Sequence, residues 1–373
     1  MKKRILGPVV LAAGLAALCS SPAMAVQNVG NTSQKGSLLI FPAITVDREN
    51  SSNTLIEISN DQSTPVHVEC YYVNERKGRV DFDFKLTGKA TASWEVLTGS
   101  GDIAAPLFPI TGTFVPGNAA KGELICFAVD AGAQNQIAFN HLTGTATVVD
   151  VFDADAAQPR QAYRYNAWAF VARDTSGNPA ADNVIQGTAG DLQLTGANDG
   201  KSYDGCPSYN IVNFQPNGAR LNSVLTIDND LVGVSCNQDL RQDFTLHLTK
   251  LKFTIWNVNE NSFTGTYICA DSVFSVAFGP LDRTPALFNG SNFDFSVLRT
   301  DNARYQVKGV ASTQCPGPPA SEAVGLLGVA TASLLIGTST GEDAEVGSTT
   351  QGAGLEAGFV LWDPAGSIPF RHK

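Results

Sequence analysis

Several patterns that would indicate common enzymes or metal proteins are missing from the sequence. Only 4 of the 373 residues are histidine, and the four are scattered along the chain. The seven cysteines form no Cys-x-x-Cys pair. Zinc centres need clustered Cys and His ligands, so this distribution disfavours zinc. No stretch has the apolar periodicity of an amphipathic helix of three turns, and this excludes helical bundles and alternating α/β folds.

Positive charge is also scarce. The chain has 25 Lys and Arg against 35 Asp and Glu, a net charge of −10. We find no run of basic residues interleaved with aromatic ones. A nucleic-acid partner and an anionic membrane surface are therefore not expected, because both are held by clustered cations.

The N-terminus has the features of a secretory signal peptide over residues 1–25. Lys2, Lys3 and Arg4 precede an apolar stretch, and Ala23-Met24-Ala25 forms a small-residue cleavage site. A lipid anchor at Cys19 would need a small residue before it, where the chain has leucine. Cleavage after residue 25 leaves 22 Lys and Arg against 35 Asp and Glu, a net charge of −13. We expect export to the periplasm, the outer surface or the extracellular space.

Six cysteines remain after removal of the signal peptide. An even number in an exported chain predicts three disulfides, although six cysteines allow 15 pairings. We favour the sequential pairing, which keeps each disulfide inside one predicted domain: 70–126, 206–236 and 269–315.

Alternating apolar and polar residues predict an all-β fold. The clearest case is residues 79–86, in which Val, Phe, Phe and Leu alternate with charged side chains. Cys70 is expected to point inward from a strand that starts at Val66. The other strands are expected at 37–46, 54–59, 90–97, 122–129, 143–151, 162–172, 209–214, 221–228, 242–256, 262–269, 272–278, 293–299 and 304–311. Such short strands indicate sandwiches or barrels.

The chain length and a shift in composition predict two domains. Residues 174–207 are rich in Gly, Asn, Asp and Ser, which is typical of a surface linker. We expect β-sandwich-like domains over 26–173 and 208–373. A change of apolar phase within 242–256 predicts a bulge near Thr249 and one strand shared by two sheets. Residues 323–336 are expected as a buried strand, with a helix as the alternative, followed by a Gly- and Ser-rich tail over 341–354 and a last strand at 359–362.

Spaced local patterns through both halves resemble an uncharacterised group of exported bacterial β-rich proteins of unknown function. The patterns are NTLIEISN (53–60), DFDFKLT (81–87), FNHLTGTA (139–146), YDGCP (203–207), CNQDLRQD (236–243) and IWNVNE (255–260). The resemblance implies export and β architecture, and it brings no catalytic residue and no ligand.

Motifs that could carry catalysis are outweighed by structural interpretations. Gly337-Thr-Ser339-Thr-Gly341 matches the spacing of a hydrolase nucleophile elbow, but no helix-forming stretch follows it. Residues 196–202 have only three residues between their glycines, where a phosphate-binding loop needs four. His67, on the outward face of its strand, and His141 are expected to be solvated or bonded to loops. We therefore predict no catalytic residue, no cofactor site and no enzyme.

Two kinds of residue are candidates for ligand binding: clustered aspartates and tryptophans. Asp150, Asp153 and Asp155, and likewise residues 228–230, cluster oxygen ligands in loops, as calcium sites do, but turns whose side chains bond their own backbone are the favoured explanation. The four tryptophans (Trp94, Trp168, Trp256 and Trp362) could stack on sugar rings if exposed, but core packing is favoured. We predict a non-catalytic structural or interaction protein with a possible protein or glycan partner. The alternatives are a glycan- or calcium-binding module and a secreted hydrolase.

Overall fold

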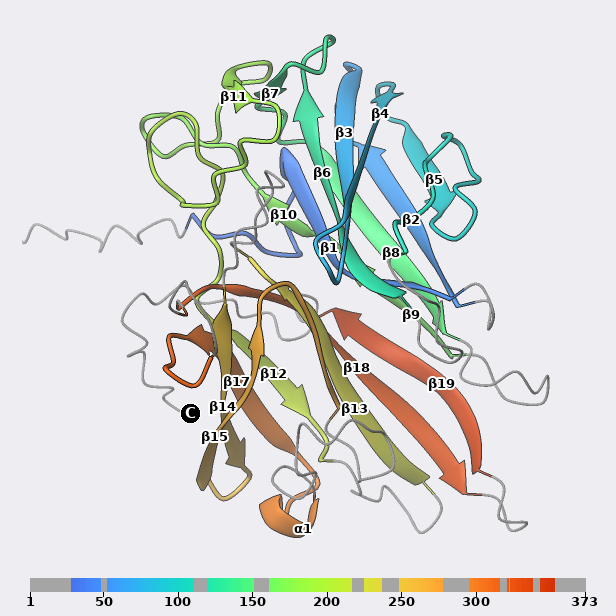
Figure 1. Ribbon diagram of the computed structural model, residues 1–373, viewed down its shortest axis with the longest axis vertical. Coiled ribbons are helices and arrows are strands. Elements are labelled where there is room, and N and C mark those ends of the chain that lie inside the picture. The colour runs from blue at the N-terminus through green and yellow to red at the C-terminus, as the bar shows by residue number, and fades with distance from the viewer. Residues whose placement is uncertain are drawn as a thin grey trace, which may run out of the picture.

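The computed structural model consists of strands, with one helical turn in the part of the chain that it describes (Figure 1). The described residues are 28–47, 52–110, 120–150, 161–216, 225–236, 248–277, 295–315, 321, 323–337 and 343–352. The all-β prediction is confirmed, and each strand pair is antiparallel. The predicted signal peptide and the predicted strand at 359–362 lie outside the described residues.

The first eleven strands form two sheets. They are β1 (Leu38–Val46), β2 (Asn53–Asn60), β3 (Val66–Asn74), β4 (Arg79–Leu86), β5 (Thr91–Glu95), β6 (Ala120–Val129), β7 (Asn135–Ile137), β8 (Leu142–Asp150), β9 (Gln161–Asn166), β10 (Trp168–Phe170) and β11 (Ile185–Thr188). Sheet I has the order β10-β1-β6-β3-β4, with β7 on β6 and β11 on β7, and sheet II has the order β5-β2-β8-β9. The predicted strand 162–172 is divided at Ala167, so that β9 joins sheet II and β10 joins sheet I.

Sheets I and II pack face to face over the first core. Leu39, Phe41 and Tyr72 of sheet I meet Ile56 and Trp94 of sheet II. The indole N–H of Trp94 donates to the Tyr72 hydroxyl oxygen at 2.7 Å, which satisfies both polar groups inside the core. The disulfide between residues 70 and 126 joins directly opposite positions of β3 and β6 in this core.

The remaining elements form a second pair of sheets. They are β12 (Asn210–Phe214), β13 (Leu225–Ser235), β14 (Thr249–Asn257), β15 (Ser262–Ala270), β16 (Val273–Ala277), α1 (Phe295–Leu298), β17 (Ala303–Val310), β18 (Leu326–Gly337) and β19 (Asp343–Gly352). Sheet III has the order β12-β17-β14-β15, and sheet IV has the order β16-β13-β18-β19. The bulge predicted near Thr249 is present as a register shift between Lys250 and Lys252.

The three predicted disulfides are confirmed, with the sequential pairing. The strand predicted within 323–336 is also confirmed as β18, and its residues 326–329 are buried. No helix in the described part of the chain is long and apolar enough to span a membrane.

Two sequence predictions about the second half are wrong. Residues 293–299 were expected as a strand, but 295–298 form the helical turn α1, which carries Leu298 into the core and lets its carbonyl accept a bond from the Asn257 side chain at 3.1 Å. Residues 341–354 were expected as a tail, but 343–352 form β19. This Gly- and Thr-rich segment forms a strand because its backbone pairs with β18. Its side chains therefore do not have to alternate between apolar and polar.

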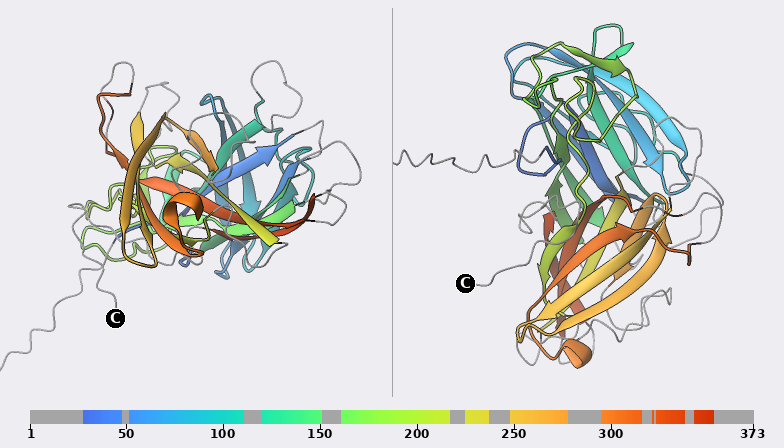
Figure 2. Two further views of the ribbon diagram at one scale, coloured as in Figure 1. Left: turned by 90° about the horizontal axis from the view of Figure 1, so that it is seen from below. Right: turned by 90° about the vertical axis from the view of Figure 1, so that its left-hand side faces the viewer.

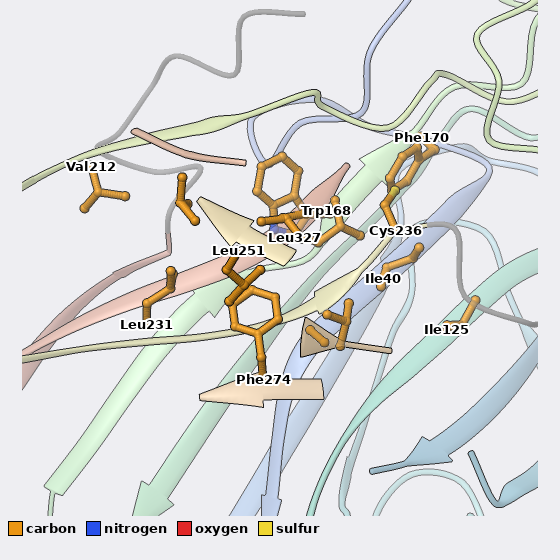
Figure 3. Close-up of a cluster of buried hydrophobic side chains, with 14 of the residues drawn as sticks. Ile40, Ile125, Trp168, Phe170, Val212, Leu231, Cys236, Leu251, Phe274 and Leu327 are labelled. Atoms are coloured by element: carbon orange, nitrogen blue, oxygen red, sulfur yellow. The ribbon is translucent and has the colours of Figure 1, made fainter. Parts of the chain in front are cut away.

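The two sandwiches share a second hydrophobic cluster (Figure 3). It contains Trp168 and Phe170 of sheet I together with Leu231, Phe274 and Leu327 of the second pair of sheets. The indole N–H of Trp168 also donates to the Gly328 carbonyl at 3.3 Å. One face of sheet I therefore packs on sheet II, and part of its other face packs on the second sandwich, as the stacked arrangement in Figure 2 shows.

The segment 174–207 is held against the first sandwich by specific bonds. Its strand β11 pairs with β7. The Asp204 carboxylate is fully buried and pairs with Arg173, with Oδ1 2.7 Å from a guanidinium Nη and 2.8 Å from Nε. Its other oxygen accepts bonds from the Val171 amide and the Gln34 side chain. These contacts give the segment a fixed course, although its composition is that of a linker.

Candidate functional site

The aspartates considered as calcium ligands do not form an open loop site in the described chain. Asp228, Asn229 and Asp230 lie inside β13, so the expectation that they occupy a loop is wrong. Asn229 is buried, and its side chain donates to the Gln215 carbonyl. Among the described residues, no group of three or more His, Cys, Asp or Glu could hold a metal ion. Asp150 ends β8, and Asp153 and Asp155 lie outside the described residues.

The histidines for which the structure shows contacts bind neighbouring loops and strands. His141 Nε2 lies 3.0 Å from Asp182 Oδ1 and 3.4 Å from the Gln62 amide nitrogen, and its ring packs edge-on against Phe139. His67 Nε2 lies 3.6 Å from Asp83 on the adjacent strand. His247, His372 and Ser339 lie outside the described residues.

The tryptophans divide between core and surface. Trp94 and Trp168 are fully buried. Trp256 lies on the outward face of β14 and is partly exposed, and Trp362 lies outside the described residues.

Polar residues within the resemblance patterns anchor loops. Asn140 accepts bonds from the Ser37 hydroxyl and the Ala172 amide and donates to the Ala172 carbonyl. Asn257 Oδ1 accepts two amide bonds within the β14–β15 turn. Because turns need such side-chain partners, these residues have a structural explanation that involves no ligand.

A groove lies at one end of sheet I, where five segments converge. Its volume is about 540 Å³, which is within the range of ligand pockets. Val66, Val129 and Ile137 contribute buried apolar side chains, and Ile185 of β11 stands on the rim with 59 % of its surface exposed. The neighbouring Val184 is 45 % exposed.

The groove is lined by one cation and one carboxylate, Lys85 and Asp130. Lys85 is exposed, lies directly opposite His67 in the β3–β4 register, and has no ion-pair partner among the described residues. Asp130 also lines the groove, but its carboxylate accepts bonds from the Asn135 side chain and from the amides of Gln134 and Gly132. These bonds, that from Asn135 foremost, lower the Asp130 pKa and direct the carboxylate toward its own turn. Of these two side chains, Lys85 is the one without a hydrogen-bond or ion-pair partner among the described residues, so its ammonium group can bind an anion.

Comparison with known proteins identifies no family. No protein-family model and no curated protein matches the chain. The crystal structure of Thermotoga maritima 1070 aligns with a TM-score of 0.26 and 7 % identity, over 36 % of this chain and 95 % of that chain. A likeness of this size carries no argument about fold or function.

Sequence reasoning did not find the groove, because its lining residues are spread from Pro65 to Ile185. The available signal was weak: two adjacent apolar residues, Val184 and Ile185, in an otherwise polar segment.

Beside the groove, Glu69 is a carboxylate in an unfavourable environment. It follows His67 on the same face of β3, and Oε1 accepts a bond from the Tyr71 hydroxyl at 2.9 Å. Burial raises the Glu69 pKa, the bond from Tyr71 opposes this, and the nearby Asp81 adds to the rise. The native state therefore binds a proton at pH values where the unfolded chain, near its ordinary pKa of 4.5, has lost it.

Replacement of Glu69 by glutamine is expected to stabilise the protein at neutral pH. Because the native pKa lies above the unfolded one, wild-type stability falls as pH rises above about 4.5, whereas glutamine does not titrate and can still accept the Tyr71 bond. The melting temperature of Glu69→Gln minus that of the wild type should thus increase between about pH 4 and pH 7. Thermal melts across this range measure it, and a difference that stays constant with pH would contradict the explanation.

Proposed function

We propose that the protein is an exported, non-catalytic interaction protein of the cell envelope or the extracellular space. The signal-peptide pattern and the resemblance to exported bacterial proteins support export, and the three disulfides are typical of oxidising compartments. The proposed function rests on the groove at the end of sheet I.

The groove has the composition of a docking site for a protein segment. Its buried apolar walls can take up one apolar side chain, and the exposed Ile185 can cover part of that side chain. Lys85 stands at the same opening without an ion-pair partner among the described residues. An apolar residue of the partner with a carboxylate close by in its sequence would satisfy both features.

The backbone offers a further contact. β11 pairs only with β7 among the described strands, so no other described strand occupies its second edge, and an extended chain could pair there. Addition of a peptide strand at such an edge supplies main-chain hydrogen bonds, while the groove supplies selectivity for the side chain. We therefore assign the partner as an extended protein segment with an apolar residue next to an acidic one.

Selection of peptides from a random displayed library on the purified full chain tests this proposal. The wild type should enrich apolar residues adjacent to Asp or Glu. Lys85→Glu should shift the enrichment toward Lys and Arg, because the charge at the opening is reversed, and Ile185→Asp should weaken binding of the selected peptides by about tenfold or more.

Two exposed positions outside the groove provide matched controls. Lys201→Glu makes the same charge change, and Leu107→Asp replaces another exposed apolar residue. Both should retain the wild-type selection. The proposal is wrong if Lys85→Glu and Lys201→Glu enrich the same peptides, or if no peptide is enriched by the wild type.

A further inference from the structure

The outer face of sheet III concentrates positive charge in an acidic protein. Side chains alternate strictly along β14 and β17, with Leu251, Phe253, Ile255, Tyr305 and Val307 buried in the core. The partly exposed positions between them hold four cations and no acid. We call this surface the basic face: Lys250, Lys252, Thr254, Trp256, Arg304, Gln306 and Lys308.

The basic face brings like charges together. Lys252 of β14 and Lys308 of β17 are directly opposite each other, and Lys250 is the next outward residue on β14. None of the three lysines has an ion-pair or hydrogen-bond partner among the described residues. Because like charges directly opposite on neighbouring strands destabilise a sheet, this arrangement favours an anion between the two ammonium groups.

Polar and aromatic side chains continue the basic face along the strands. Thr254 lies opposite Gln306 on one side and Thr264 on the other, and Thr266 lies opposite Lys252. At the far end Trp256 lies opposite Arg304, whose guanidinium carbon is 5.3 Å from the centre of the indole ring. In the right-hand view of Figure 2, the gold and orange strands of sheet III face the viewer.

The spacing of these groups suits an extended polymer. Outward residues from 250 to 256 span six strand steps, or about 20 Å, and the three adjacent strands are about 4.8 Å apart. Ammonium groups at one end can bind anionic substituents, threonine hydroxyls and the glutamine amide can exchange hydrogen bonds with sugar hydroxyls, and an indole ring at the other end can pack on a sugar ring.

We propose that the basic face binds an extended anionic polysaccharide, with Lys252 and Lys308 holding one of its acidic groups. The hydroxyl and amide groups between the cations favour a glycan over a nucleic acid, which would use several exposed aromatic side chains to stack its bases. They also favour a glycan over a membrane surface, which is bound by cations together with protruding apolar groups. This site is separate from the groove, so either proposal can fail without the other.

Titration calorimetry of the purified full chain with polygalacturonate, a polymer of acidic sugars, tests the proposal. Binding is expected at low salt and should weaken as salt is raised, and neutral dextran should not bind. The double variant Lys252→Gln/Lys308→Gln should lose about tenfold or more in affinity, and Trp256→Leu should also weaken binding. Lys89→Gln/Lys201→Gln removes the same charge from exposed positions elsewhere and should bind as the wild type does.

A second measurement separates lost binding from lost folding. Removal of the opposed lysine pair relieves repulsion, so the free double variant should melt at the same temperature as the wild type or higher. Lys85→Glu, in the groove, should keep its affinity for polygalacturonate. The proposal is overturned if the wild type does not bind polygalacturonate, if the two double variants bind equally, or if DNA or phosphatidylglycerol vesicles bind more tightly than the polysaccharide.

Discussion

Replacement of Asp204 by asparagine is expected to lower the free energy of unfolding by about 3–5 kcal/mol, because a buried cation is left without its counter-charge. Asp204 is fully buried, and its carboxylate pairs with Arg173 at 2.7 Å while accepting bonds from Val171 and Gln34. Asparagine has nearly the same shape but no charge, and its amide group can replace only part of these acceptors. Urea denaturation of wild type and variant at neutral pH measures the loss.

Two controls separate the charge from other effects. Asp182→Asn removes the carboxylate that pairs with His141 at the surface and should cost about 1 kcal/mol or less. The double variant Arg173→Met/Asp204→Leu removes both charges and should be more stable than Asp204→Asn, because no unpaired ion remains. If Asp204→Asn destabilises no more than Asp182→Asn, the buried ion pair does not have the energetic role assigned to it.

Replacement of Trp168 by alanine is the second change with a large expected effect. Trp168 is fully buried in the cluster shared by the two sandwiches, and its indole N–H donates to Gly328. Removal of a buried tryptophan side chain costs about 3–5 kcal/mol through lost burial and the cavity left behind. Because the cavity would lie between the sandwiches, we also expect the two to unfold less cooperatively.

Denaturation followed by two probes checks this prediction. Far-ultraviolet circular dichroism and fluorescence should report coincident transitions for the wild type and separated ones for Trp168→Ala. Trp168→Phe retains most of the ring and loses the bond to Gly328, so it should cost less than the alanine variant. A variant that melts in one coincident step near the wild-type temperature would show that the shared cluster does not couple the two sandwiches.

The sequence predicted strands well wherever one face is buried and the other is solvated. Residues 79–86 show why, because their apolar side chains alternate with charged ones as expected for a strand with one buried and one solvated face. β4 has the predicted bounds. The sequential pairing of the cysteines was favoured because it keeps each disulfide within one predicted domain, and the structure confirms it. β19 could not be predicted in this way, because its place is set by pairing with β18 and not by its own side chains. The helical turn α1 was missed because its conformation is fixed by the burial of Leu298 and the bond from Asn257.

The candidate binding surfaces depend on contacts between distant segments, which a single sequence does not reveal. The basic face could have been found in part, since Lys250, Lys252 and Trp256 alternate with buried residues in one short stretch. This run holds only two lysines and two aromatic side chains, so it does not stand out as a basic patch in the sequence. Lys308 is assigned to the basic face only because the register of β14 and β17 places it opposite Lys252.

The apolar cluster between the sandwiches limits how the chain could be divided. Cutting the gene near codon 207 would give two fragments, each with an apolar surface that the whole protein covers, with Trp168 and Phe170 on one and Phe274 and Leu327 on the other. Such surfaces promote aggregation of isolated fragments. In evolution and in the laboratory, the two sandwiches should therefore behave as one unit and would not be readily exchanged as separate modules.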